Sequence, residues 1–207
     1  MTKTVILAST SPRRIEMMGW LKISFQPIPS TVDESKIRHK APRKLTRLLA
    51  EAKAQSLASK YPDAIVIGSD AIVSFKDQIL EKPRDKQHQR KMINMQKGQE
   101  AKVYSSVCII DTSTGQKVIK SKTTPYKMAD ISPDEIERYI DTNSGLDKAG
   151  GYGQQDENGM FVDSINGCYT NAIGFPMCDV ASILKAMNVP VVSGIKQIVK
   201  SKTGRKC

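Results

Sequence analysis

Strand-forming and helix-forming segments alternate along this chain. Residues 4–8 (TVILA) predict a buried strand, and further strands are predicted over 64–74, 102–110 and 116–124. Residues 42–59 predict a strong helix because their leucines recur on or near one face, and further helices are predicted from Ser11-Pro12 onward and over 86–97, 132–140 and 176–187. Strands and helices mixed in this order favour a single domain of the α/β or α+β class.

The composition is that of an ordinary globular protein. Of the 207 residues, 39% are apolar and 26% are charged, which excludes long disordered or collagen-like segments. No apolar run approaches the ~20 residues that a membrane helix needs. The apolar stretch within the N-terminal segment MTKTVILASTSPRR is too short for a signal peptide. We therefore expect a soluble, cytoplasmic protein with no membrane partner.

Cysteine and histidine are scarce and unfavourably spaced for metal or nucleophilic sites. The four cysteines form no C-x-x-C pair, so free cytosolic thiols are expected. Only two histidines occur, which argues against a Ser-His-Asp triad or a multi-histidine metal site. Any chemistry must then depend on carboxylates, lysine and arginine, with or without a metal held by oxygen ligands.

The formal charge is +11, from 32 basic and 21 acidic residues. Residues 196–207 hold five basic residues and no acidic one, and we expect a flexible basic tail there, after a domain that spans 1–195. Aromatic residues make up only 5% and no RRM, KH or zinc-finger motif occurs, so nucleic acid is a poor candidate partner. Phosphorylated small molecules fit the charge at least as well, and a merely solvated basic surface is the alternative.

The first candidate site is the hexapeptide Ser9-Thr10-Ser11-Pro12-Arg13-Arg14. Arginines in the first turn of a helix oppose the helix dipole, which is tolerable where an anion binds. Helix N–H groups, hydroxyls and guanidinium groups would then converge on a phosphate. The alternative is that both arginines point into solvent.

The second candidate site is Asp70, which with Gly68-Ser69 interrupts an apolar strand run. A buried carboxylate needs a partner, so we expect Asp70 at a strand end beside a metal, a cation or water. Asp33-Glu34 could add a carboxylate for Mg²⁺ or Mn²⁺ or could be a plain surface pair.

Lysines form a third set of candidates, at Lys53, Lys82 and Lys148, although one lysine alone means little. No P-loop and no G-x-G-x-x-G motif accompanies them.

Seven ordered blocks resemble the Maf (septum-formation-inhibitor) nucleotide pyrophosphatases over about residues 4–190. They are LASTSPRR (7–14), VDE (32–34), LAEAKA (49–54), GSDAIV (68–73), EKPRD (81–85), DKAGGYGQQ (147–155) and INGCYTNAIGFP (165–176). The resemblance implies a single α/β Maf/ITPase-like domain, with a mixed twisted sheet flanked by helices and a deep active-site cleft, and members are often homodimers. It implies hydrolysis of nucleoside triphosphates to monophosphate and diphosphate with a divalent cation.

The resemblance also implies a role for each matching residue. Asp70 would be the general base, and Glu34 and Asp70 would hold the metal. The phosphates would be bound by Ser9, Arg13, Arg14, Lys53 and Lys82. Substrate selection would fall to Gln155 together with Arg13 and Ala71.

Three departures from the family pattern bear on specificity. Ala71 stands where the family has threonine, residues 152–156 (YGQQD) stand where many members have YGIQG, and 97–102 (KGQEAK) replace an SG-x-x-H stretch. The blocks SPRR, EKPRD and DKAG-x-YG-x-Q favour the dTTP/UTP branch and a house-cleaning role. The alternatives are a 7-methyl-GTP pyrophosphatase and a non-catalytic nucleotide- or nucleic-acid-binding regulator of cell division.

Overall fold

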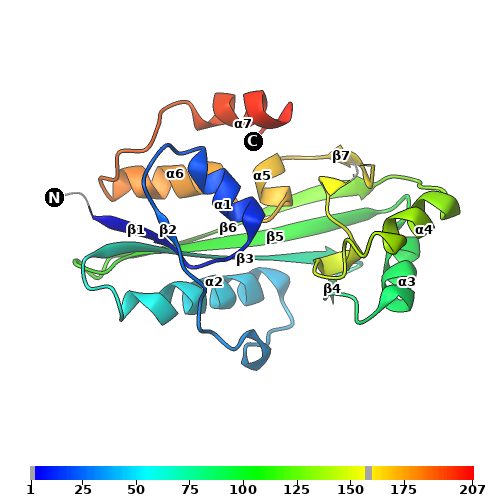
Figure 1. Ribbon diagram of the computed structural model, residues 1–207, viewed down its shortest axis with the longest axis horizontal. Coiled ribbons are helices and arrows are strands. Elements are labelled where there is room, and N and C mark those ends of the chain that lie inside the picture. The colour runs from blue at the N-terminus through cyan, green and yellow to red at the C-terminus, as the bar shows by residue number, and fades with distance from the viewer. Residues whose placement is uncertain (1–2, 157–159) are drawn as a thin grey trace.

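A mixed β-sheet with helices on both faces organises the molecule (Figure 1). The computed structural model describes residues 3–156 and 160–207. The strand order is β2-β1-β3-β5-β6-β7, with β4 paired to β3. The strands are β1 (Thr4–Leu7), β2 (Gln26–Pro27), β3 (Ala64–Phe75), β4 (Gln78–Leu80), β5 (Glu100–Asp111), β6 (Lys117–Met128) and β7 (Val162–Ile165).

The sheet is parallel at one edge and antiparallel through its centre. Strand β1 runs parallel to β2 and to β3, while β3, β5 and β6 form long antiparallel ladders. This mixed sheet confirms an α/β domain, one of the two classes that the alternating segments favour.

The helices divide between the two faces of the sheet (Figure 1). On one face lies α2 (Pro42–Ala58), and on the other lie α1 (Pro12–Gly19), α5 (Tyr169–Ala172), α6 (Met177–Ala186) and α7 (Ile195–Thr203). At the far end of the long strands lie α3 (Lys86–Gln96) and α4 (Pro133–Asp141). The short 3-10 turns are η1 (Glu34–Lys36) and η2 (Ala149–Gly151).

Alternate residues of β3 enter different hydrophobic clusters because successive strand side chains point to opposite faces. Ile65 and Ile67 pack with α1 and α6, whereas Ala64 and Val66 pack with α2. A separate cluster around α3 and α4 includes Tyr139 and fills the far end of the sheet. The two ends of the long strands therefore carry different cores.

Helix α2 approaches β3 closely at Gly68. A Cβ atom at that position would lie 2.2 Å from the Ala50 carbonyl oxygen and 2.5 Å from the Ala54 nitrogen. Only glycine permits this approach. The close contact brings the turn of α2 that contains Ala50 and Ala54 against the centre of β3.

Most predicted elements are present, and three features differ from expectation. Strand β3 continues through Gly68-Ser69-Asp70, where an interruption was expected, because β5 pairs with it along this stretch. The segment expected as a flexible tail contains α7, and its Val199 is fully buried in the core. The prediction of free thiols is wrong for Cys168 and Cys207, which form a disulfide across 39 residues.

The capping box predicted at Ser132 is confirmed: its hydroxyl accepts from the Glu135 N–H, and the Glu135 carboxylate accepts from the Ser132 N–H. Within the described ranges, no helix is long and apolar enough to span a membrane.

Candidate active site

A buried lysine lies between two carboxylates where α2 meets β3. Lys53 places its Nζ 2.7 Å from Asp70 Oδ1 and 3.1 Å from Glu34 Oε1. Lys53 and Asp70 are only 7% and 6% exposed, whereas Glu34 is exposed. A buried charge without a counterion is strongly destabilising. Lys53 is therefore the partner that the sequence analysis predicted for a buried Asp70. Asp70 lies within β3 rather than at a strand end, which corrects its expected position.

Burial raises the pKa of the Asp70 carboxyl above its ordinary value, and the positive charges of Lys53 and Arg14 oppose that rise. The nearby Glu34 carboxylate adds to it. A carboxylate with a raised pKa that is still held by cations is a stronger base than a solvated one.

The turn from β1 into α1 faces the same region through Arg14. Its Nη1 donates to the Ser69 carbonyl at 2.9 Å, and its Nε donates to the Gly174 carbonyl at 3.3 Å. Burial lowers the pKa of Arg14, while the charge of Asp70 opposes that effect. At the start of the turn the buried Ser9 hydroxyl accepts from the Ser11 N–H at 3.1 Å. The solvent-facing alternative therefore does not hold for Arg14.

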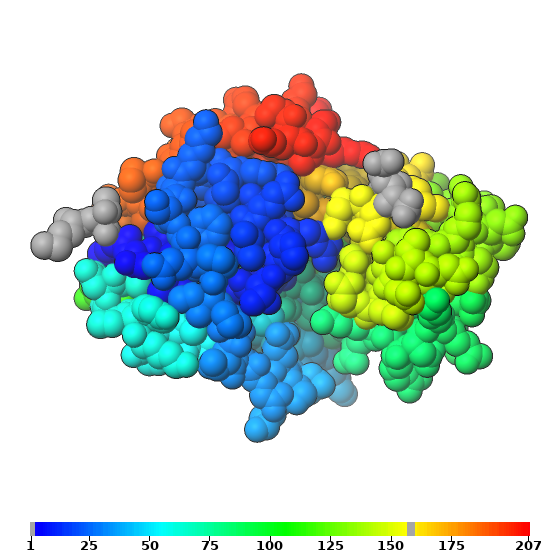
Figure 2. Space-filling view, viewed as in Figure 1, coloured from blue at the N-terminus to red at the C-terminus, as the bar shows by residue number. Residues whose placement is uncertain are grey.

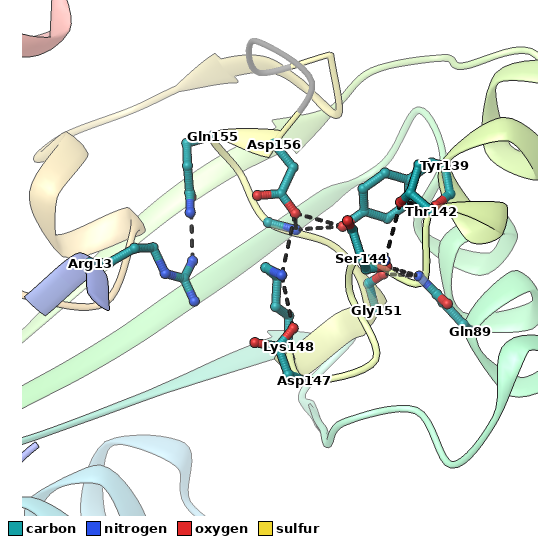
Figure 3. Close-up of polar contacts among 11 residues, drawn as sticks. Arg13, Gln89, Tyr139, Thr142, Ser144, Asp147, Lys148, Gly151, Gln155 and Asp156 are labelled. Carbon is teal, nitrogen blue, oxygen red and sulfur yellow. Dashed lines mark hydrogen bonds and ion pairs between the residues drawn. The ribbon is translucent and has the colours of Figure 1, made fainter. Parts of the chain in front are cut away.

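Arg13 spans the site to the loop before β7. Its Nη1 donates to Gln155 Oε1 at 3.3 Å, which joins residues 142 positions apart (Figure 3). In Figure 2 the surface recedes between α1, drawn blue, and the yellow loop that carries Gln155. Arg14 therefore binds backbone carbonyls, including that of Ser69 in β3, whereas Arg13 reaches across this recess to Gln155.

Two other residues predicted for the site, Lys82 and Ala71, are not part of the polar group described above. Lys82 is exposed after β4, and within the described chain no ion pair or side-chain hydrogen bond is found for it. The backbone carbonyl of its neighbour Glu81 accepts from the Gly150 N–H at 3.2 Å, which ties this segment to the loop 147–156. Ala71 packs beneath Gly174, where an added Cβ would lie 3.2 Å from the Ala71 Cβ.

The sequence matches the family described as Maf-like protein over residues 4–187. The chain belongs to the Maf family. This confirms the resemblance carried by the seven sequence blocks, all of which fall inside the matched range.

Curated relatives of this Maf protein match it over nearly their whole lengths. A dTTP/UTP pyrophosphatase of Desulforamulus reducens is 37% identical over 92% of this chain and 100% of the relative. Proteins with the same name from Clostridium botulinum (strain Kyoto / Type A2) and Alkaliphilus metalliredigens are 39% and 40% identical, over 90% and 87% of this chain and 98% and 94% of theirs. A solved HAM1 protein from Coxiella burnetii is 12% identical with a TM-score of 0.49, over 90% of this chain and 100% of that one, a likeness too distant to bear on the site.

Two carboxylates that flank Lys53, those of Glu34 and Asp70, could offer oxygen ligands to a metal. Among the described residues no group of three or more His, Cys, Asp or Glu side chains could hold a metal ion. Glu34 and Asp70 both approach one ammonium group. Two carboxylates suit Mg²⁺ or Mn²⁺ when substrate phosphates complete the coordination, so the donor set of this Maf protein fits such an ion.

Sequence reasoning missed several contributors to the site. The carbonyls of Ser69 and Gly174 orient Arg14, but every residue has a backbone carbonyl. Asp156 anchors the turn that carries Gln155, and its only sequence signal is that it departs from the family pattern.

Proposed function

We propose that this Maf protein is a cytoplasmic nucleoside triphosphate pyrophosphatase that hydrolyses dTTP and UTP to the monophosphate and diphosphate. The observation that carries the proposal is the buried Asp70–Lys53 pair beside Arg14, with Arg13 and Gln155 meeting across the recess. This arrangement would supply a base, cations and an amide, which are the groups that the reaction needs. Relatives named dTTP/UTP pyrophosphatase support the substrate assignment.

Basic residues would bind the triphosphate in this proposal. Arg13 and Arg14 lie in the first turn of α1, where helix N–H groups also favour an anion. Ser9 would donate its hydroxyl, and Lys53 and Lys82 would place ammonium groups on the phosphate oxygens. These contacts would stabilise the charge that develops on the leaving group.

Asp70 would act as the general base. Its carboxylate would accept a proton from a water molecule whose oxygen attacks the α-phosphorus. The new P–O bond would form as the bond between the α-phosphorus and the bridging oxygen breaks, and diphosphate would leave with that electron pair. Lys53 would hold Asp70 ionised for this step.

We also propose that a divalent cation, Mg²⁺ or Mn²⁺, binds with the substrate. Glu34 and Asp70 would hold it, and the ion would neutralise charge on the phosphate oxygens. The residues of the chain would still position the water and the α-phosphate.

Base selection would depend on the orientation of the Gln155 amide. Arginine has donors only, so the amide atom that faces Arg13 must be the oxygen. The Gln155 NH₂ group is then free to donate a hydrogen bond to the nucleobase. It would donate to the O4 acceptor of thymine or uracil and would meet a donor in cytosine, which favours dTTP and UTP over CTP.

The test is diphosphate release from dTTP, UTP, CTP, ATP, GTP and 7-methyl-GTP with Mg²⁺ and with Mn²⁺. We expect the highest kcat/KM for dTTP and UTP. An Ala71→Thr variant, which restores the family hydroxyl, should sharpen that preference. Highest activity on 7-methyl-GTP, or binding of nucleotides without turnover, would contradict the proposal.

A further inference from the structure

We propose that Asp156 is a positioning residue that fixes Gln155 in the orientation that selects the base. The inference rests on the proposed function, because it concerns how the same site discriminates between pyrimidines. Asp156 touches neither Arg13 nor Asp70 in the described contacts, so it would act only through the turn that carries Gln155.

Three donors converge on one carboxylate oxygen of Asp156 (Figure 3). Its Oδ2 accepts from the Tyr139 hydroxyl at 2.7 Å and from the Gly153 N–H at 3.1 Å, and Lys148 Nζ lies 3.5 Å away. The Asp156 N–H donates to the Gly153 carbonyl at 3.0 Å and closes the turn. The residue immediately before this anchor is Gln155.

The turn is shaped to receive the carboxylate. A Cβ atom at Gly153 would lie between 2.4 and 2.6 Å from the carboxylate atoms of Asp156. Asp156 can therefore lie flat against the turn only because residue 153 is glycine.

Tyr139 gives the anchor a rigid support on α4. It is 2% exposed, and its ring meets Phe161 edge-on with centroids 4.4 Å apart. Burial and the Asp156 charge raise the pKa of Tyr139, so its hydroxyl stays protonated and keeps donating. The position of Asp156 is thus fixed from the hydrophobic core of the far end of the sheet.

Asp156 therefore links this hydrophobic core to Gln155, whose side-chain amide would contact the base. Gln155 is held on one side by its bond to Arg13 at 3.3 Å and on the other by the anchored turn. If the anchor is lost, the backbone of Gln155 can shift away from Arg13 and break that bond, and the amide can then present either its donor or its acceptor to the base. The consequence is a loss of discrimination between thymine and cytosine rather than a uniform loss of activity.

The test compares Asp156→Ala with wild type in two measurements, kcat/KM for dTTP and dCTP and calorimetric Kd for dTMP and dCMP. We expect the preference for thymine to fall about tenfold in both, the equivalent of one lost hydrogen bond, mainly through KM. Asp156→Asn should restore part of the preference, because an amide oxygen can still accept from Tyr139 and Gly153. The matched control is Asp163→Asn, which removes an exposed carboxylate paired with Lys127, and its preference should equal that of wild type.

Equal losses for both bases, or an unchanged preference, would overturn the inference. If Asp156→Ala does not fold, Tyr139→Phe decides, since it removes one donor to the carboxylate and leaves the ring packing in place. The binding measurement separates this inference from the proposed function. A wild type that binds dTMP selectively but hydrolyses no triphosphate would contradict the function alone.

Discussion

Lys53 is the residue on which the electrostatics of the site depend. Its ammonium group is shared by Asp70, which is buried, and Glu34, which is exposed. Desolvation favours the protonated form of Asp70, and Lys53 favours the ionised form. The Lys53 charge therefore favours the ionised Asp70 that the proposed general base requires.

A Lys53→Met variant should shift the pH profile of kcat/KM. The base must be ionised, so activity rises with pH through the pKa of Asp70. Removing the cation raises that pKa further, and the acidic limb should move to higher pH as well as fall in height. Lys36→Met, at a lysine side chain that is 82% exposed, should leave the limb in place. A limb that stays put in Lys53→Met would remove Lys53 from this role.

At the scale of elements, the packing of α2 on β3 sets the geometry of this pair. The helix can approach closely because residue 68 has no side chain. Lys53 lies on the helix beside this contact, and Asp70 lies two residues further along the strand, so the same approach brings both groups together.

Gly68→Ala should destabilise the protein by about 1–3 kcal/mol, because its methyl group would overlap the backbone of α2. Thermal unfolding measures this change, and kcat should fall in the folded fraction because α2 is pushed away from Asp70. Gly19→Ala is the matched control, since nothing lies within 4 Å of its added Cβ. Equal unfolding temperatures for the two variants would contradict the close approach.

The disulfide ties the last residues of the chain to the loop before α5. Cys207 is linked to Cys168, and the Tyr169 N–H donates to the Lys206 carbonyl at 2.9 Å. A crosslink that closes a loop of this length stabilises a fold by about 3–5 kcal/mol in the chain-entropy account.

Cys207→Ser should therefore lower the free energy of unfolding under oxidising conditions by an amount of that order. The difference from wild type should disappear in reductant. Cys178→Ser, which changes a free thiol, should show no such dependence on redox conditions. A wild type whose stability is the same with and without reductant would show that the crosslink does not form.

At the scale of the whole molecule, the site joins segments that are distant in the sequence. Local patterns predict the strands, the helices and the capping box because each depends on residues within one or two turns. They could not predict that Lys53 pairs with Asp70 or that Arg13 meets Gln155 142 residues later, since these contacts depend on how α2 and α1 dock on the sheet. Asp70 was recognisable as a carboxylate in need of a partner, but its partner was not.

Substitution of Arg13 and of Lys82 tests whether each of these side chains acts on the triphosphate. Alanine at either position should lower kcat/KM for dTTP by at least about tenfold, or about 1.4 kcal/mol. For Arg13→Ala the preference for thymine should fall as well, because Gln155 loses the donor that orients it. Unchanged kinetics in both variants would indicate that these two side chains are merely solvated and do not bind the triphosphate.

In the proposed mechanism, water activated by Asp70 attacks the α-phosphorus. Hydrolysis of dTTP in ¹⁸O-labelled water tests it directly, because mass spectrometry shows which product carries the label. We predict that the label enters dTMP and is absent from diphosphate. Asp70→Asn, folded as wild type by circular dichroism, should lose activity by a factor of about 10²–10⁴. Label in diphosphate, or near-normal turnover by Asp70→Asn, would contradict this mechanism.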